Sequence, residues 1–490
     1  MQGSVEFFQA PPETDEQIRP VTCYRLVWEA DVSDRSTQAV ANAAGTTPHL
    51  RRVLTLWDLI FYGIVLIMPI APVPMFGIAQ KLSHGHFVTT ILLAMAAMLF
   101  TAVSYGRMAA LYPTAGSAYT YVGRGLNPHL GFLTGWAMFL DYLIQPLLNG
   151  IFVTLTVKRF IPQVPYFILA AVFVGLMTGL NLRGIRTTAR ANVILVAIMS
   201  VVIVAFMVLA VRYLFHWGGW GGVLSLQPFY DPKAFDIRLI WTATSYAALT
   251  YIGFDGVTTL AEDVVNPKRN VMLAAVSVCL FTGIVGGLEV YLGQRVWPDY
   301  STFPNLETAF MDVTRRVGGP LLFQALGIIL ILACMGAGMA GQVGAARLLF
   351  GMGRDNVLPR RIFAYLDPKH NTPTRNIWLI GIVAYIGTLL ISYEQAGEIL
   401  NFGAFLAFMG VNFATFWQFT VISCPDHKRR PFQDVVMPLI GFVFCLWIWV
   451  GLKTPAKIVG GVWFLAGLAY CALKTHGFRT RPLMIDFRES

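Results

Sequence analysis

The sequence alternates between long apolar runs and short polar connections. A helix needs roughly 20 residues to cross the hydrocarbon core of a bilayer. Two shorter stretches, 116–126 and 302–316, are typical of amphipathic helices lying at the membrane surface. The pattern therefore predicts an all-α integral membrane protein with 12 transmembrane helices. Their approximate ranges are 56–80, 87–111, 129–157, 164–182, 190–214, 238–262, 271–296, 319–347, 376–393, 397–422, 432–452 and 456–474.

Two of these runs are interrupted near their centres. In the first run, Pro69, Pro72 and Pro74 remove three backbone donors, and their rings clash with the preceding turn. In the sixth run, Gly253 and Gly256 lie on either side of Phe254-Asp255. Paired interruptions at corresponding positions of two halves indicate a secondary transporter built from inverted repeats. We therefore expect a 5+5 inverted repeat with broken helices 1 and 6, followed by two extra C-terminal helices.

The same pattern divides the chain into segments. Residues 1–50 are polar and lack the apolar core of a signal peptide, which predicts a cytoplasmic N-terminal tail with one short ordered piece at 24–28. The other expected segments are a transport core at 51–422 (repeat one about 51–214, repeat two about 236–422), two additional transmembrane helices at 423–475 and a cytoplasmic C-terminal tail at 476–490.

Composition and charge agree with this class. Only 13% of the residues are charged, against roughly 25% in soluble domains. The net charge is +10, and 25 of the 36 Lys and Arg residues fall on the side of the N-terminal tail. Cytoplasmic loops carry the excess of Lys and Arg. The basic residues therefore predict a multi-pass protein of the inner (cytoplasmic) membrane with both termini cytoplasmic, and no nucleic-acid partner.

Carboxylates at bilayer depth are candidates for function, because burying a charge there is costly. Asp255, in the sixth-run break, is expected to attract a substrate amine or carry a proton; the alternative is a cap on the half-helix N-terminus. Asp141 shares one face of the third run with Thr134, Gln145 and Asn149. For Asp141, a cation or proton site and a structural hydrogen bond between helices both remain open.

Glu289, in the seventh run, is the third proton-coupling candidate beside Asp141 and Asp255. A structural role for Glu289 is equally open. Six cysteines without a spacing motif, and the pair His84 and His86 without a third ligand, predict no metal site. No nucleophile elbow or phosphate-binding loop is present, so we expect no catalytic residue, no cofactor and no enzyme. Close helix packing is the simplest interpretation of the glycines of the eighth run: Gly336, Gly338, Gly341 and Gly344.

Several motifs, in order over about residues 52–475, resemble amino acid–polyamine–organocation (APC) superfamily transporters, and within them bacterial putrescine importers. The motifs are Tyr112–Tyr121 (YPTAGSAYTY), Gly253-Phe254-Asp255 with Ala261-Glu262-Asp263 and Asn266–Arg269, Gly351–Pro359, and Leu400–Ala404. The resemblance implies alternating access around a central site formed by broken spans 1 and 6 with spans 3, 8 and 10. The substrate-binding positions expected on this pattern are Met68, Ile70, Ala71, Asp141, Tyr142, Tyr251, Gly253, Phe254 and Asp255.

The chain departs from its relatives in the first break. The resemblance implies that amino acid carriers hold the substrate carboxylate on backbone N–H groups there, whereas proline has none. Pro74 stands where putrescine importers carry a further acid, so a monoamine or more apolar cation remains open beside a diamine. The fifth span has no lysine, and the eighth lacks the hydroxyls of a sodium site. Proton coupling is therefore favoured by elimination, and amine exchange stays open.

These features predict a secondary active transporter that imports a small organic amine (polyamine, monoamine or related cation) by alternating access with proton coupling. The alternative is an amino acid permease or amine/amino acid exchanger of the same fold. A third hypothesis, a non-transporting sensor or structural subunit, is disfavoured because we expect no domain beyond the tail. The expected partners are the substrate, the proton and the lipid bilayer, and the oligomeric state is left open.

Overall fold

The computed structural model describes residues 54–114, 116–184, 189–354, 358–368, 372–422 and 430–480. Within these ranges the regular structure is helical, apart from one isolated bridge between Leu54 and Val264. Eight of the described helices are long and apolar enough to cross a membrane, and three shorter apolar helices accompany them. The all-helical membrane class is confirmed. The count of 12 crossings, the inverted repeat and the segment boundaries remain predictions.

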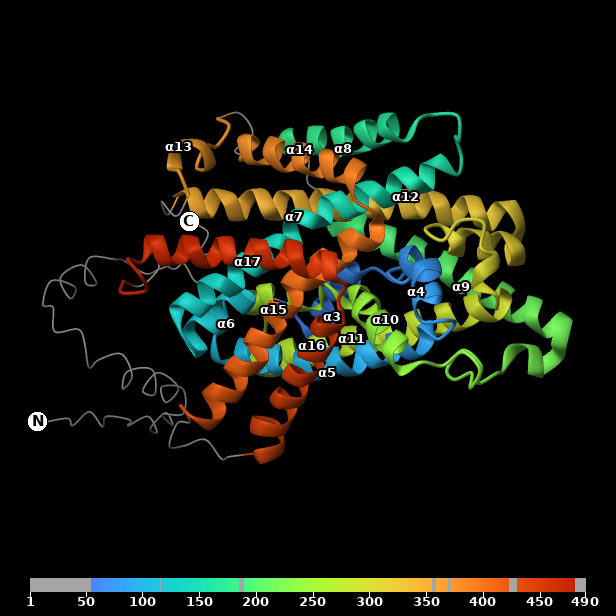
Figure 1. Ribbon diagram of the computed structural model, residues 1–490, viewed down its shortest axis with the longest axis horizontal. Helices are drawn as coiled ribbons and strands as arrows, with labels where there is room; N and C mark the ends of the chain where they lie inside the picture. Colours follow the sequence, from blue (N-terminus) through green and yellow to red (C-terminus); the bar gives the residue numbers. More distant parts are fainter. Residues whose placement is uncertain are drawn as a thin grey trace, which may run out of the picture. The chain divides into compact units, whose positions relative to one another are not determined.

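Every apolar run expected from the sequence contains a helix (Figure 1). The helices are α3 (Leu56–Ile67), α4 (Phe76–Leu82), α5 (Phe87–Leu111), α6 (Ser117–Gly125), α7 (Pro128–Lys158), α8 (Tyr166–Leu182), α9 (Ala189–Val223), α10 (Ile237–Ala247), α11 (Pro267–Val296), α12 (Ala309–Arg354), α13 (Arg360–Phe363), α14 (Thr374–Leu390), α15 (Tyr393–Thr420), α16 (Met437–Gly451) and α17 (Thr454–Lys474). Short 3₁₀ turns are η2 (Val73–Met75), η3 (Ala248–Tyr251), η4 (Phe254–Asp263) and η5 (Tyr300–Thr302), and η6 (Phe432–Val436) is a π-helical turn.

The two expected surface helices differ in outcome. α6 covers nearly the whole of 116–126. The second stretch, 302–316, is helical only from Ala309, where α12 begins. α12 then continues beyond this stretch through Gly319, whose φ of 66° is non-helical. The tail 1–50, Cys23, Cys424–His427 and the last ten residues lie outside the described residues.

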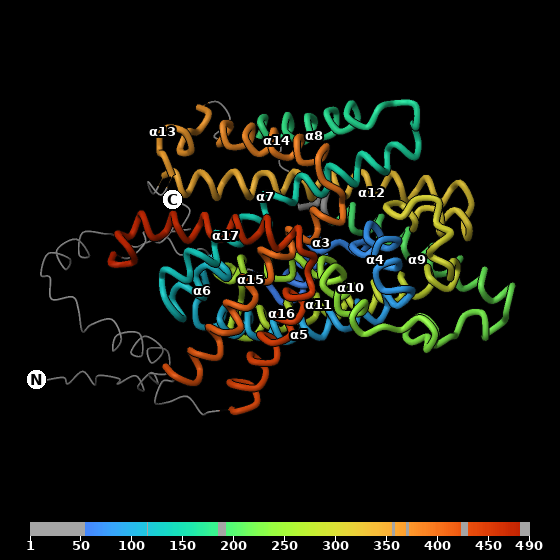
Figure 2. The backbone as a smooth tube through the Cα atoms, in the orientation of Figure 1, coloured from blue at the N-terminus to red at the C-terminus, as the bar shows by residue number. Residues whose placement is uncertain are grey.

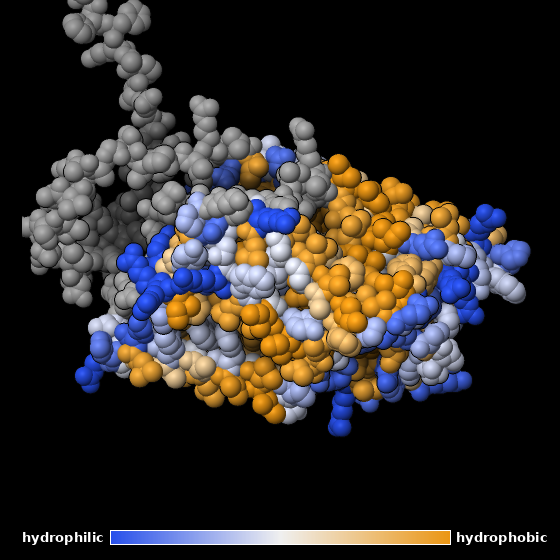
Figure 3. Space-filling view, turned by 90° about the horizontal axis from the view of Figure 1, so that it is seen from above, coloured by the Kyte–Doolittle hydropathy of each residue, from blue (hydrophilic) through white to orange (hydrophobic). Residues whose placement is uncertain are grey.

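Large apolar side chains cover much of the outside of the bundle. Val201, Val204 and Val208 on α9 are 68%, 57% and 61% exposed, and Val462 and Leu465 on α17 are also exposed. The space-filling view shows a broad orange area between blue margins (Figure 3). A contiguous apolar surface of this kind marks contact with a membrane, since water would oppose it.

The α12 glycines allow close contact with α7. A methyl group on Gly341 would lie 2.9 Å from Gln145 Cβ, and one on Gly344 would lie 3.0 Å from Tyr142 Cδ1. Gly338 similarly faces Asn149, whereas a methyl on Gly336 would meet no atom within 4 Å. Small residues let helix backbones approach closely in membranes. The close-packing interpretation is therefore confirmed for Gly338, Gly341 and Gly344 but is wrong for Gly336.

We expect Gly341→Ala to destabilise the protein by about 1–3 kcal/mol, because the added methyl forces α7 and α12 apart. The matched control is Gly336→Ala in the same helix, which adds a methyl in open space and should leave stability unchanged or slightly raised. Thermal midpoints of the purified variants in detergent would measure the difference. Equal midpoints for the two variants would contradict the packing account.

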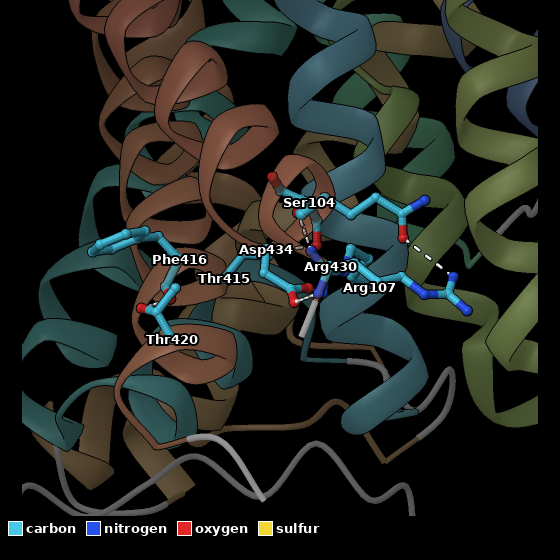
Figure 4. Close-up of polar contacts among 8 residues, drawn as sticks. Ser104, Arg107, Thr415, Phe416, Thr420, Arg430 and Asp434 are labelled. Atoms are coloured by element: carbon cyan, nitrogen blue, oxygen red, sulfur yellow. Dashed lines mark hydrogen bonds and ion pairs between the residues drawn. The ribbon is translucent and has the colours of Figure 1, made fainter. Parts of the chain in front are cut away.

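A buried ion pair joins α5 to the segment before α16. The Arg107 guanidinium bonds the Asp434 carboxylate and the Gln433 carbonyl, and it lies 3.7 Å from the centre of the Phe419 ring. The Arg430 N–H donates to the other Asp434 oxygen at 2.6 Å. Figure 4 shows Arg107 extending toward Asp434, with Ser104 and Thr415 nearby. The pair therefore fixes α16 against α5 at one end of the bundle.

We predict that Asp434→Ala lowers stability by about 3–5 kcal/mol, because it leaves the Arg107 charge buried without its carboxylate. Asp299→Asn serves as the control: it removes an exposed charge but keeps the side-chain oxygen that caps η5, so little change is expected. Detergent-solubilised thermal unfolding compares the two. A midpoint for Asp434→Ala equal to that of the control would show that the buried pair contributes nothing.

Candidate functional site

The first span is interrupted where its three prolines begin. α3 ends at Ile67, and Met68 has φ 68° and ψ 134°, an uncommon conformation for a residue with a side chain. The chain then turns through η2 into α4. Met68 and Ala71 are partly accessible, whereas Ile70 is 3% exposed. The sequence prediction of a break at the prolines is confirmed.

Most amide groups of this break already have partners. Residues 68–75 are all described, and three of them are prolines without an N–H group. The N–H groups of Met68, Ala71, Val73 and Met75 donate to carbonyls three or four residues earlier, at 2.9–3.2 Å. Within this segment only the Ile70 N–H has no such bond. The break therefore offers few backbone donors to a ligand.

The sixth span is interrupted at Gly253, which lies beside the first break. Gly253 has a φ of 113°, a region that glycine enters without strain, and η4 follows it as a 3₁₀ helix. A methyl group on Gly253 would lie 3.6 Å from Ile67 Cγ1, and one on Gly256 would lie 2.5 Å from Leu66 Cδ1. In Figure 2 the blue trace of α3 lies next to α11, the helix that follows this segment. Helix 6 is thus broken as predicted, and the two breaks touch.

Asp255 occupies the first turn after this break. Its carboxyl lies near the backbone of Gly253, Asp255 and Gly256. The Gly256 N–H donates to the Gly253 carbonyl at 3.0 Å and is thus already bonded within the turn. The Asp255 side chain is partly accessible. Asp255 therefore lies in the first turn of η4, where an acid is favourable, and its carboxylate remains available to a ligand.

Asp141 on α7 faces the same region. Its carboxyl interacts electrostatically with that of Asp255, and its Oδ1 atom is buried without a hydrogen-bond partner. The neighbouring Tyr142 interacts electrostatically with both carboxyls while its ring lies against Gly344. Two carboxylates and a phenol from α7 and η4 therefore share one buried environment.

Two residues of the polar face of α7, Gln145 and Asn149, have a structural role. Gln145 and Asn149 contact the glycines of α12, and Asn149 Nδ2 donates to the Gln145 carbonyl at 2.8 Å. Thr134, at the other end, donates to the Leu130 carbonyl. Helical spacing correctly placed these residues on one face, but only Asp141 among them interacts electrostatically with Asp255.

Aromatic rings form one wall beside Asp255. Phe254 is fully buried, with ring centroids 5.5 Å from Tyr105 and 5.2 Å from Phe408. Tyr251 is also fully buried, and its hydroxyl donates to the Ile91 carbonyl at 2.9 Å. The Tyr251 hydroxyl is thus engaged with α5 rather than with the two carboxylates.

Three residues near Asp255 were missed by the sequence analysis. Tyr105, Tyr121 and Cys279 all interact electrostatically with Asp255. They come from α5, α6 and α11; Tyr105 and Cys279 lie in apolar runs without a local signal, and Tyr121 lies in the stretch expected to be a surface helix. The only local hint was Tyr121, which belongs to the motif after the second span.

Glu289 lies apart from the other two acids. It is fully buried on α11, and neither carboxyl oxygen has a hydrogen-bond partner. No titratable group among the described residues exerts an electrostatic influence on it. One turn before and one turn after it along α11, Gly286 faces Pro72 and Gly293 faces Phe76, which places this side of the helix against the first break. The three proton-coupling candidates therefore form one pair and one isolated residue.

The described residues contain no cluster of His, Cys, Asp and Glu that could hold a metal. His86 accepts a hydrogen bond from the Asp231 N–H at 2.9 Å through Nε2, and its Nδ1 lies 2.9 Å from the Ser83 carbonyl. His84 stacks on Tyr300 instead. The two histidines therefore serve the packing of loops.

The contacts of two broken helices around a carboxylate pair define a membrane transporter rather than an enzyme site. A family model described as amino acid permease matches residues 70–468. The chain belongs to this family, within the APC superfamily. Its resemblance to this superfamily is thereby confirmed.

Known relatives include transporters of different substrates. The chain is 32% identical over 433 residues to the low-affinity putrescine importer PlaP of Escherichia coli K12, covering 88% of this chain and 95% of that one. It is 27% identical to the methylthioribose transporter of Bacillus subtilis (87% and 94% covered) and 24% identical to the branched-chain amino acid permease BcaP of Lactococcus lactis (86% and 94% covered). The printed names of all three describe transport, as an importer, a transporter and a permease, in agreement with a chain that is not an enzyme.

Proposed function

We propose that this protein imports a small organic amine across the cytoplasmic membrane by alternating access, coupled to protons. The observation that carries the proposal is the pair Asp141 and Asp255 beside the two touching breaks. Two carboxylates in one buried environment repel each other unless a cation or a proton lies between them. An ammonium group, with three donors and one positive charge, satisfies both.

The first break favours an amine over an amino acid. A substrate carboxylate would need free backbone N–H groups, and most of those in residues 68–75 are absent or already bonded. The kinship with a putrescine importer supports the same choice. Tyr142 and Phe254, together with the partly accessible Met68, would supply apolar walls and cation–π contact to the amine.

Proton coupling follows from the same pair in our proposal. In each cycle Asp255 would bind the amine while Asp141 carries one proton from the outer face, and both would be released at the inner face, so that the proton gradient drives import. The Asp141 Oδ1 atom without a partner supports a proton on this carboxyl, because a buried polar atom without a hydrogen bond is costly. With both termini cytoplasmic, as the Lys and Arg distribution indicates, substrate would enter from the face with fewer basic residues.

We expect Asp255→Asn to reduce amine uptake to background. A hydrogen bond to a charged group contributes roughly 1.5–3 kcal/mol, so affinity should fall about 10- to 100-fold or more. Asparagine has nearly the shape of aspartate and keeps one side-chain oxygen, so the variant should fold. Uptake of labelled putrescine into proteoliposomes measures the loss, and Asp299→Asn, in an exposed loop, is the charge-matched control. Normal uptake by Asp255→Asn would refute the proposed role.

The second candidate function is an amino acid permease, which kinship with the BcaP permease favours. Counterflow separates the two. We expect unlabelled putrescine or butylamine inside proteoliposomes to drive accumulation of labelled amine, whereas leucine inside should not. Counterflow driven by leucine but by neither amine would identify the amino acid permease instead.

A further inference from the structure

Three acidic side chains gather at one end of the bundle, away from Asp255. Glu394 and Glu398 lie in the first two turns of α15, and Glu307 precedes α12. Glu394 interacts electrostatically with both of the others. The connections at this end belong to the face with fewer basic residues, which we propose to be the outer face. The cluster is therefore placed where a substrate would arrive.

Basic groups neutralise this acidic cluster only in part. Lys453 forms an ion pair with Glu394, and it also lies within electrostatic range of Glu398. The Lys457 ammonium is within electrostatic range of Glu398 as well, but it donates to the Val450 carbonyl at 2.6 Å. Within the described part of the chain, Glu307 has no ion-pair partner. Three carboxyl groups thus face two ammonium groups, so the acids outnumber the bases.

Unpartnered polar atoms next to this cluster provide an independent indication of a ligand. Tyr246 is fully buried, its hydroxyl has no hydrogen bond, and it interacts electrostatically with all three acids. Glu398 is 2% exposed with Oε1 unpartnered, and Asn401, fully buried one turn further along α15, has Oδ1 unpartnered. Native structures seldom leave such atoms without partners. Together these atoms offer three acceptors, the number that the three N–H donors of a primary ammonium group require.

The side chains of this cluster are held in place by neighbouring helices. Asn401 Nδ2 donates to the Ser245 carbonyl at 2.8 Å, which fixes the amide and leaves its oxygen free. A methyl on Gly397 would lie 3.5 Å from Tyr246 Cε2, so α15 and α10 are in direct contact here. Burial and the neighbouring Glu394 raise the pKa of Glu307, as expected where carboxylates crowd together. A cation would relieve this crowding.

The cluster lies in line with the central site along two elements. On α15, Glu398 is followed at seven and ten residues by Phe405 and Phe408, which places it roughly 10–15 Å from the aromatic wall at Phe254. On the sixth span, Tyr246 precedes the break at Gly253 by seven residues. A molecule moving from this end of the bundle to Asp255 therefore passes the cluster first.

We propose that Glu307, Glu394, Glu398 and Tyr246, with Asn401, form a second and weaker binding site for the ammonium group of the substrate, on its path to Asp255. This site rests on the proposed amine transport. Its partial neutralisation by Lys453 makes binding weak. Salt should weaken it further, because Glu394 is partly exposed and its attraction for an arriving cation is screened. The ammonium group would bind here first and then move inward to Asp255.

The test is equilibrium binding of labelled putrescine and butylamine to the purified full chain in detergent. In the Asp255→Asn variant the central site is disabled, and we expect residual saturable binding that weakens several-fold when salt is raised. Adding Glu398→Gln to this variant should remove the residual binding, and adding Tyr246→Phe should weaken it several-fold. The control addition, Asp299→Asn, changes one carboxylate elsewhere on the same face and should leave it unchanged.

The outcomes separate the two proposals. If the Asp255→Asn protein shows no residual binding, or if neither Glu398→Gln nor Tyr246→Phe alters that binding, the second site is overturned while amine transport stands. If the unaltered chain binds neither amine in a saturable way, the proposed function itself is overturned, and the second site with it. Elution as a single peak in size-exclusion chromatography would establish that each variant is folded.

Discussion

The requirement that backbone polar groups find partners inside a membrane governs this protein. A continuous helix meets the requirement within itself, whereas an interrupted helix must meet it by other means. In the first span the prolines remove donors, and short turns pair most of those that remain. In the sixth span the chain turns at Gly253, the Gly256 N–H donates to the Gly253 carbonyl, and the Asp255 carboxylate lies in the first turn of η4. The two helix breaks touch, so the Asp255 carboxylate lies beside the first break, which offers few backbone donors.

This arrangement links fold to function. The glycines of α12 let α7 come close enough to bring Asp141 toward Asp255, and α15 adds the aromatic ring of Phe408. The central pair and the outer cluster have one feature in common: in each, the carboxyl groups outnumber the basic groups beside them. In our account, the outer cluster is partly neutralised by lysines and binds weakly, whereas the inner pair has no basic side chain beside it among the described residues and binds the amine for transport.

The sequence predicted the features that depend on residues close together in the chain. Apolar run length located the helices, and proline and glycine located both breaks, because these signals act within a few residues. What it missed depends on contacts between helices. Helical spacing grouped Gln145 with Asp141, yet Gln145 faces α12; Tyr105 and Cys279 gave no signal, yet both lie near Asp255. Glu289 resembled the other acids in sequence, but the fold separates it from them.

The most direct measurement of the central claim is a cryo-electron microscopy structure of the protein with bound butylamine. The account predicts the ammonium nitrogen within hydrogen-bond distance, about 2.7–3.2 Å, of the Asp255 carboxylate and on the side facing Asp141. Its alkyl chain should lie against Tyr142 and Phe254. Density for the amine away from both carboxylates, or an amino acid whose carboxylate is bound by the backbone of residues 68–75, would contradict it.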